Sequence, residues 1–183
     1  MTSTAQQDQG PEHGAARHDT RLGGQAALYT EEERARRDSS VWTIVQGVLA
    51  PVQFVIFAVS LVLVLRTLAT GEGAFAADVS IIAKTFALYA IMVTGSIWEK
   101  VVFGKWLFAR PFFWEDVFSM VVIGLHTAYL AMLLGGIGSV EARMLVALAG
   151  YAAYVVNAGQ FLLKLRAARL ACAARPDAQA VPA

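Results

Sequence analysis

Residues 96–118 read SIWEKVVFGKWLFARPFFWEDVF, and this central connection joins two strongly apolar stretches of the chain. It gathers three carboxylates, three cations and three of the four tryptophans into one short segment. These residues are Glu99, Glu115, Asp116, Lys100, Lys105, Arg110, Trp98, Trp106 and Trp114. A simple solvent-exposed loop does not combine large aromatic side chains and charges at this density.

Composition places the chain among membrane proteins. Of its 183 residues, 57% are apolar and only 16% are charged, which is far from the usual balance of a soluble domain. The charges crowd the two ends of the chain and the central connection. Cys172 is the single cysteine, so no intrachain disulfide and no paired-cysteine metal or redox site is expected.

Four apolar segments are long enough to cross a bilayer. Residues 41–65 contain no charge and exceed the roughly 20 residues that a transmembrane helix needs. Similar segments cover about residues 79–98, 117–134 and 144–163. We expect Pro51 to kink the first helix, Asp78 to cap the second and Lys84 to snorkel to the nearby interface. The sequence therefore predicts an all-α, polytopic membrane protein with four transmembrane helices in an antiparallel bundle, within residues 41–170.

The two ends of the chain are polar. Residues 1–28, which include His13 and His18, and residues 171–183 cannot build a core, and we expect both tails to be disordered. Between the first tail and the first span, Thr30 and Glu33 have the spacing of a capping box. This spacing predicts a short helix at the membrane surface within residues 29–40.

Lysines and arginines give the orientation. The N-terminal segment, the central connection and the C-terminal end carry 12 of them, whereas the other two connections carry one each, Arg66 and Arg143. Because positive residues are retained on the cytoplasmic side, both termini and the central connection are expected in the cytoplasm.

The polar residues inside the spans fall on single helix faces when they are placed at 100° per residue. The aligned sets are Gln46 and Gln53 on the first helix; Lys84, Met92, Gly95, Ser96 and Glu99 on the second; Glu115, Ser119, His126 and Tyr129 on the third; and Tyr154, Asn157, Gln160 and Lys164 on the fourth. Since polar groups avoid lipid, these faces predict a polar seam, which is either a hydrogen-bonded helix interface or a lined cavity.

His126 has three interpretations that the residues leave open. It is a structural histidine, an axial ligand to a metallated macrocycle, or a proton donor and acceptor. The other histidines lie in the N-terminal tail, which argues against a bis-histidine haem site or a di-metal cluster.

The tryptophans have two interpretations: they form an interfacial belt, or they pack against a flat ligand. Burial beside these rings would favour the protonated form of a neighbouring carboxyl group, which could then act as a general acid.

Five strings of residues carry a resemblance to a known family. They are Trp42–Pro51 (WTIVQGVLAP), Ile91–Gly104 (IMVTGSIWEKVVFG), Phe113–Ser119 (FWEDVFS), Leu125–Leu130 (LHTAYL) and Asn157–Leu162 (NAGQFL). With these strings the sequence closely resembles the 2-vinyl bacteriochlorophyllide hydratase family of bacteriochlorophyll biosynthesis, over about residues 28–170.

The resemblance implies hydration of the C3 vinyl group of a chlorophyllide-type tetrapyrrole to a 3-(1-hydroxyethyl) group, without a redox cofactor. It also implies the cytoplasmic or intracytoplasmic membrane of a phototrophic bacterium as the location. The expected partners are the pigment and the lipid bilayer, with no nucleic acid. A homo-oligomer and contacts with neighbouring pathway enzymes stay open.

This reaction needs a general acid beside the terminal vinyl carbon, a base that activates water and an apolar slot for the ring. Our candidate acids are Glu99 and Glu115, and our candidate bases are Asp116 and His126. Candidate substrate-binding residues are Trp98, Phe113 and Trp114 against the ring, Tyr154 and Asn157 for water or ring carbonyls, and Lys100, Lys105, Arg110 or Lys164 for the free propionate. No protein-bound metal is expected, and a role for His126 as ligand to the substrate magnesium stays open.

Two rival functions fit the same composition. A non-enzymatic membrane protein that binds or assembles pigment would use the same histidine and aromatic residues without changing the ring. A small transporter would place an ionisable residue deep in a symmetric pathway, whereas here the first span has none and the acids sit at one interface.

Overall fold

The computed structural model describes residues 29–173, apart from a few side chains near the end of the last helix. The tails predicted to be disordered, 1–28 and most of 171–183, lie outside the described residues, as do His13 and His18. The side chain of Cys172 is likewise not described.

Residues 29–173 form helices and no strands. The helices are α1 (Glu31–Ser39), α2 (Val41–Thr70), α3 (Ala74–Phe103), the 3-10 helix η1 (Arg110–Phe112), α4 (Phe113–Leu134) and α5 (Val140–Ala173). In the described part, α2, α3, α5 and the α4 segment with η1 are each long and apolar enough to cross a membrane, which confirms the four predicted spanning segments. α2 continues through Pro51, and α2, α3 and α5 extend beyond the apolar segments seen in the sequence.

The helix ends follow from local chemistry, with one exception. The capping box is confirmed, because Thr30 accepts from the Glu33 N–H and Glu33 accepts from the Thr30 N–H. Gly71 and Gly104 end α2 and α3 in the left-handed conformation that glycine adopts without strain. The predicted cap at Asp78 is wrong: α3 already begins at Ala74, and Asp78 lies one turn inside it.

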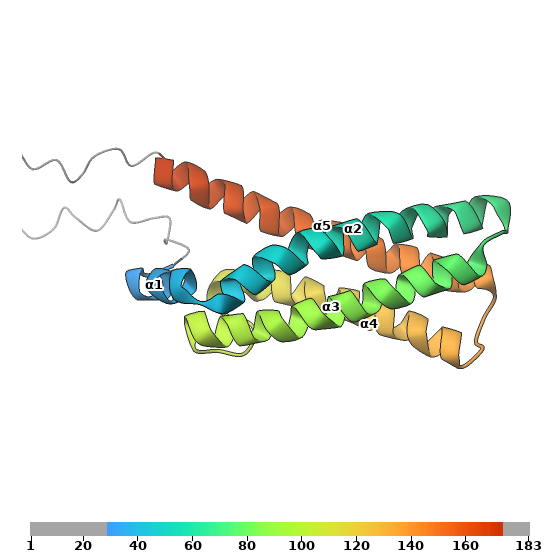
Figure 1. The fold of residues 1–183 in the computed structure, drawn as a ribbon, viewed down its shortest axis with the longest axis horizontal. Helices are drawn as coiled ribbons and strands as arrows, with labels where there is room; N and C mark the ends of the chain where they lie inside the picture. Colours follow the sequence, from blue (N-terminus) through green and yellow to red (C-terminus); the bar gives the residue numbers. More distant parts are fainter. Residues whose placement is uncertain (1–28, 174–183) are drawn as a thin grey trace, which may run out of the picture.

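The helices pair along the chain. α2 packs mainly on α3 and α4 mainly on α5, while α1 contacts the last turns of α3. Figure 1 shows that α1, the α3–α4 connection and the last turns of α5 lie at one end of the bundle, and that the α2–α3 and α4–α5 turns lie at the other. The central connection therefore lies beside α1, which precedes it by sixty residues or so in sequence.

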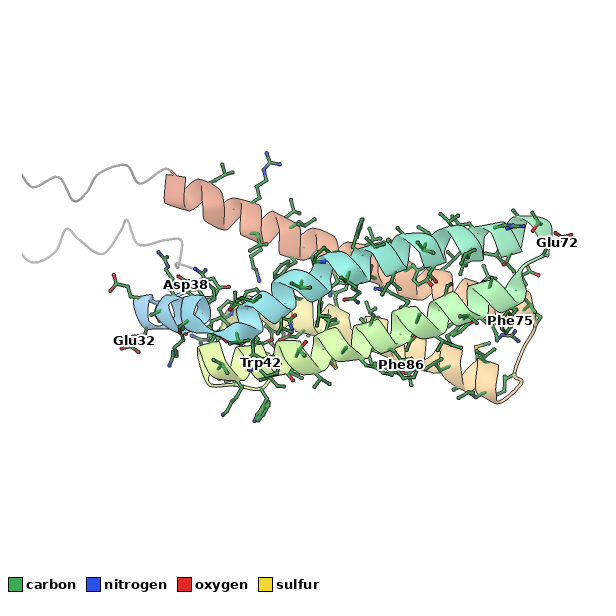
Figure 2. All side chains as sticks on the ribbon, in the orientation of Figure 1. Glu32, Asp38, Trp42, Glu72, Phe75 and Phe86 are labelled. Atoms are coloured by element: carbon green, nitrogen blue, oxygen red, sulfur yellow. The ribbon has the colours of Figure 1, made fainter. Side chains whose placement is uncertain are left out.

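The outer surface of the bundle is apolar. Valines, leucines and phenylalanines are exposed along all four long helices; Phe75 and Phe86, for example, are 83% and 62% exposed. Figure 2 shows these two phenylalanines on the outside of α3, with charged residues such as Glu32, Asp38 and Glu72 at the two ends. An apolar girdle between charged ends is the surface that a bilayer requires.

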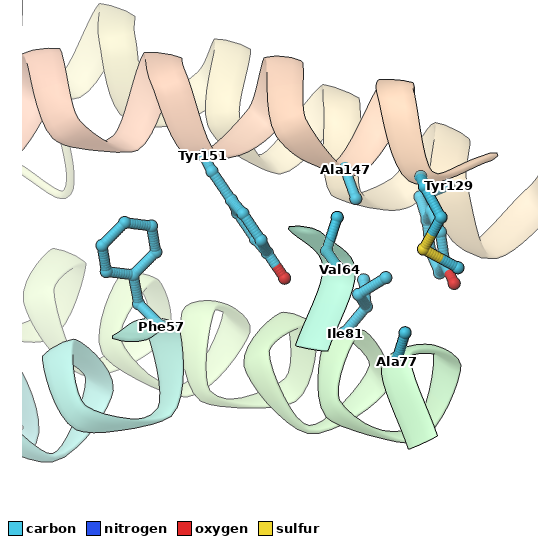
Figure 3. Packing of buried hydrophobic residues seen from close by; sticks show 8 residues of the cluster. Phe57, Val64, Ala77, Ile81, Tyr129, Ala147 and Tyr151 are labelled. Atoms are coloured by element: carbon cyan, nitrogen blue, oxygen red, sulfur yellow. The ribbon is translucent and has the colours of Figure 1, made fainter. Parts of the chain in front are cut away.

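The main hydrophobic core lies in the half of the bundle away from α1. It brings together Phe57, Val64, Ala77, Ile81, Tyr129, Met144, Ala147 and Tyr151. Figure 3 shows Phe57 and Tyr151 projecting toward one another between α2 and α5, where their rings meet edge to face at 5.4 Å. A second, smaller cluster of Tyr29, Val102 and Phe112 closes the α1 end, and Trp98 and Phe103 pack against it.

Lys84 does not snorkel to the interface as the sequence suggested. Its side chain is fully buried, and Nζ lies 3.7 Å from the ring centroid of Tyr154. Because α3 starts earlier than expected, Lys84 stands about three turns inside the helix and faces the bundle. The amine is held against the face of an aromatic ring instead of reaching water.

Asp78 takes part in a polar lock at the end of the bundle opposite α1. The Tyr129 hydroxyl donates to Asp78 Oδ1, and Arg143 Nη2 lies 3.5 Å from Asp78 Oδ2. These three residues come from α4, α3 and α5, so one carboxylate joins three helices. Hydrogen bonds to charged groups are among the stronger ones, which makes this lock a main constraint on helix register.

We predict that Tyr129→Phe destabilises the bundle by about 1–2 kcal/mol, because it leaves the half-buried carboxylate of Asp78 with one partner fewer. The matched control is Tyr89→Phe, since the Tyr89 hydroxyl makes its interhelical bond to Thr127 on the exposed surface. Thermal unfolding of detergent-solubilised protein, followed by circular dichroism, measures both variants. Equal midpoints for the two variants would mean that Asp78 does not lock the helices.

Candidate functional site

A cavity of about 480 Å³ opens near the α1 end and is lined by all four long helices together with α1 and η1. Its volume lies in the range of pockets that hold small molecules. The lining is mainly apolar and aromatic, and its ionisable residues are Tyr29, Arg37, Glu99, Glu115, Asp116 and Tyr154. The predicted polar seam is thus a lined cavity at this end of the bundle.

Glu99 and Asp116 form a carboxyl pair in the cavity wall. Both side chains are buried, and they lie next to each other because the N–H groups of two consecutive residues, Phe108 and Ala109, donate to Asp116 and to Glu99. Two adjacent buried carboxylates repel each other, so we expect the pair to hold one proton. The pair joins the last turn of α3 to the first turn of α4.

The central connection holds this pair with its backbone. The Phe108 N–H donates to Asp116 Oδ2 at 2.7 Å, and the next N–H, of Ala109, donates to Glu99 Oε2 at 3.0 Å. Phe108 has φ = 58°, a conformation that costs energy for a residue with a side chain. The strained turn aims two consecutive N–H groups at the two acids, so the loop and the carboxyl pair form one unit.

Glu115 forms an ion pair with Lys164. Its Oε1 lies 2.5 Å from Lys164 Nζ, and the same amine donates to the Pro111 carbonyl. Glu115 Oε2 is buried and has no hydrogen-bond partner among the described residues, although Glu115 lines the cavity. Glu115 therefore uses one oxygen in an ion pair and leaves the other unused, whereas Glu99 and Asp116 have no cation beside them.

Amide side chains line the deeper part of the cavity. Asn157 Nδ2 donates to the Ser119 hydroxyl at 2.8 Å, which leaves Asn157 Oδ1 buried without a partner in the described part of the chain. Gln53 Nε2 is likewise buried and unpaired there, and Gln46 is held by the Thr94 hydroxyl at 2.7 Å. These amides thus offer one free acceptor and one free donor to a bound molecule, in addition to Glu115 Oε2.

Aromatic side chains shape the mouth of the cavity. Trp98 and Phe112 line it, and their ring centroids are 5.6 Å apart in an edge-on arrangement. The Trp98 indole N–H donates to the Thr43 hydroxyl at 2.9 Å, which fixes the plane of the indole. Tyr29 covers this group and stacks on Phe103 at 5.7 Å, and burial raises the pKa of its phenol, so the ring is neutral.

Several sequence-predicted site residues lie outside this lining. Phe113 and Trp114 are 44% and 64% exposed and point away from the cavity, which fits the interfacial belt. Lys100 donates to the Gly104 carbonyl and caps the end of α3. Among the other predicted residues, Glu99, Glu115, Asp116, Trp98, Tyr154 and Asn157 come together around the cavity, and Lys164 reaches it through Glu115.

His126 is buried one turn below the cavity. Its Nδ1 donates to the Val122 carbonyl at 2.8 Å, and its ring lies 5.7 Å from that of Tyr151. Gly150 lies directly against the ring, because a Cβ at that position would be 2.9 Å from Cε1. Val122 lines the cavity but His126 does not, so the imidazole lies under the site and not in its wall.

Sequence reasoning missed part of the lining. Gln46 and Gln53 were noticed as one polar face, but nothing in their spacing linked them to the acids. Tyr29 and Arg37 gave no signal at all, because they precede the spans and reach the cavity only through packing of α1 on α3. Phe161 had a usable signal, since it lies one helical turn after Asn157.

Comparisons with known proteins identify the family of this chain. The family model described as 2-vinyl bacteriochlorophyllide hydratase matches residues 29–167. The protein called 2-vinyl bacteriochlorophyllide hydratase in Rhodobacter capsulatus is 66% identical over 147 residues, which are 80% of this chain and 85% of that protein. Its namesake in Cereibacter sphaeroides is 67% identical over 143 residues, covering 78% of this chain and 89% of that protein. No solved structure matches the chain.

The matched region begins with Tyr29 and runs through α5, so it contains the whole cavity lining. The model covers far more than half of the chain, and each relative is matched over most of its own length. This chain belongs to the 2-vinyl bacteriochlorophyllide hydratase family.

Proposed function

We propose that this chain catalyses the reaction for which its relatives are named, the addition of water to the vinyl group of a bacteriochlorophyllide, and that it does so in the cavity at the α1 end. The product carries a 1-hydroxyethyl group in place of the vinyl group. The observation that carries the proposal is the buried pair of Glu99 and Asp116, held by two consecutive N–H groups in the wall of an aromatic cavity.

The first step is transfer of the shared proton to the terminal vinyl carbon. The pair holds one proton, and burial keeps it from exchanging freely with bulk water. Protonation breaks the vinyl π bond and leaves a cation at the inner carbon, which is delocalised into the macrocycle. The pair is then fully ionised, and together with Glu115 it stabilises this positive charge.

The second step is attack of water on the inner carbon. The free Oδ1 of Asn157 accepts a hydrogen bond from this water, and Glu115 Oε2 offers a second acceptor. As the carbon–oxygen bond forms, the excess proton of the water returns to the Glu99–Asp116 pair. The proton balance closes, so the enzyme ends the cycle as it began and needs no electron donor or acceptor.

The remaining predicted residues have supporting positions. Trp98 packs against the ring and Tyr154 lies deeper in the cavity, supported by Lys84 beneath it. His126 takes no part in the proposed steps, because its ring lies outside the lining and is bonded to the Val122 carbonyl. The proposal therefore does not use His126 to activate water or to bind the substrate magnesium.

We predict that Glu99→Gln and Asp116→Asn each lower the hydration rate by about 10²–10⁴-fold, the usual contribution of a general acid. The amide oxygens can still accept hydrogen bonds from the N–H groups of Ala109 and Phe108, so both bonds to the central connection are kept in either variant. The measurement is the mass gain of one water by the vinyl substrate in isolated membranes. In deuterated water, the wild-type product should carry one non-exchangeable deuterium in its new methyl group.

The control is Glu141→Gln, which removes an exposed carboxylate at the opposite end of the bundle. It should hydrate the substrate at the normal rate. If Glu99→Gln and Asp116→Asn match this control at equal expression, the carboxyl pair is not the proton source. A wild-type protein that binds the pigment but forms no hydrated product would instead favour the pigment-binding function.

We further propose that the four spans form an antiparallel bundle in the cytoplasmic or intracytoplasmic membrane, with both termini and the α3–α4 connection in the cytoplasm. The charge count supports this orientation, since 12 of the 15 lysines and arginines belong to the segments assigned to that side. The mouth of the cavity then lies at the cytoplasmic interface, where both an amphiphilic pigment and water are available.

Single-cysteine labelling tests the orientation. In a Cys172→Ser background, we predict that Glu72→Cys reacts with a membrane-impermeant maleimide in cells whose outer membrane is opened. Lys105→Cys should react only in inside-out vesicles. Both positions are exposed in turns at opposite ends of the bundle, so accessibility to the reagent is matched. The reverse labelling pattern would invert the proposed topology.

A further inference from the structure

Arg37 lines the cavity although it belongs to α1, outside the spanning helices. Its guanidinium lies over the ring of Tyr29, 4.7 Å from the centroid, and Tyr29 in turn packs on Phe103 and Phe112. Arg37 is therefore held at the mouth by stacking and not left free on a surface helix.

The other positive side chains near the cavity already bind groups of the protein itself. Lys164 Nζ is engaged by Glu115 and by the Pro111 carbonyl, and Lys100 Nζ caps α3 at the Gly104 carbonyl. In the described part of the chain, Arg37 is the one lysine or arginine that lines the cavity. It is thus the positive group that a bound anion can reach.

The Arg37 guanidinium has N–H donors that its ion pair with Asp38 does not use. Its Nε and Nη2 both contact the same oxygen of Asp38, at 2.8 and 2.7 Å, and the Asp38 side chain is 60% exposed. A guanidinium carries five N–H donors in a fork, so this ion pair leaves donors for a second carboxylate. The geometry suits a bidentate contact with an anion at the mouth.

The substrate chemistry supplies such an anion. A chlorophyllide has a free propionate on the five-membered ring next to the one that carries the vinyl group. The two-methylene arm that carries this carboxylate is flexible, so it can turn toward a cation at the α1 end when the vinyl group lies against the Glu99–Asp116 pair. Arg37 lies at that end, because its carbonyl accepts from Thr43, whose hydroxyl accepts from the indole N–H of Trp98, the neighbour of Glu99.

A substrate carboxylate at the mouth of the cavity also needs a positive group beside it. The cavity wall already holds Glu115 and the carboxyl pair, which would repel a second negative charge at close range. Because the mouth is partly shielded from water by Tyr29 and Phe112, a fixed cation is worth more there than on an open surface.

We propose that Arg37 is a specificity-determining residue, which binds the propionate carboxylate of the pigment and makes the site selective for the free acid over its ester. This inference rests on the proposed function of the cavity. It assigns to α1 the role of recognising the free carboxylate of the substrate.

The test compares the vinyl bacteriochlorophyllide with its propionate methyl ester. For the wild-type protein we expect a KM about ten- to thirtyfold lower for the acid than for the ester, as a charge-assisted contact at a partly exposed site would give. Arg37→Gln should raise the KM for the acid to the level of the ester, leave the KM for the ester unchanged and change kcat less than twofold. Arg37→Lys should restore part of the selectivity.

The matched control is Arg36→Gln, which removes the same charge from the neighbouring, exposed position of α1 and should leave both KM values unchanged. The proposal is wrong if the wild-type protein does not distinguish acid from ester, or if Arg37→Gln weakens both substrates equally, as a purely structural role would.

Equilibrium binding, read as quenching of tryptophan fluorescence by the pigment, separates this test from the proposed function. If the wild-type protein forms no hydrated product yet binds the acid more tightly than the ester through Arg37, only the proposed reaction fails. If it hydrates both pigments but binds them equally, only the role of Arg37 fails.

Discussion

The two consecutive N–H groups of Phe108 and Ala109, held on the carboxyl groups of Asp116 and Glu99, are the interaction on which the functional end of this molecule depends. They tie the end of α3, the start of α4 and the connection between them into one unit. Without them, two buried acids would lie side by side at the membrane interface with too few donors. With them, each acid has a backbone donor that fixes its position.

The two ends of the bundle use buried charge differently. At the far end, Asp78 is satisfied by Tyr129 and Arg143 and serves as a lock between helices. At the α1 end, Glu115 and Asn157 each keep a buried oxygen without a partner in the described residues. Unsatisfied buried acceptors cost free energy, and a site that binds water and a polarised substrate is where such a cost has a use.

Much of the architecture could be predicted. Length and charge content were enough to locate four spanning segments, and the Thr30–Glu33 spacing was enough to find the start of α1. Helical periodicity placed Glu99, Glu115, Tyr154 and Asn157 on inward faces, where they line the cavity. Predictions that depended on helix ends failed: Asp78 and Lys84 were placed near an interface, but α3 begins a turn earlier, because glycine at position 73 and not a polar side chain sets its start.

The sequence by itself determined that this chain is an apolar helical protein with an acidic, aromatic connection, because composition and periodicity are local properties that survive in any packing. Only the tertiary structure decided which residues meet. It paired Glu99 with Asp116, turned Trp114 and Phe113 outward, buried His126 beneath the site and brought Arg37 from α1 to the mouth. These outcomes depend on how separate helices rotate and approach one another, and such contacts between distant residues leave no periodic trace in the sequence.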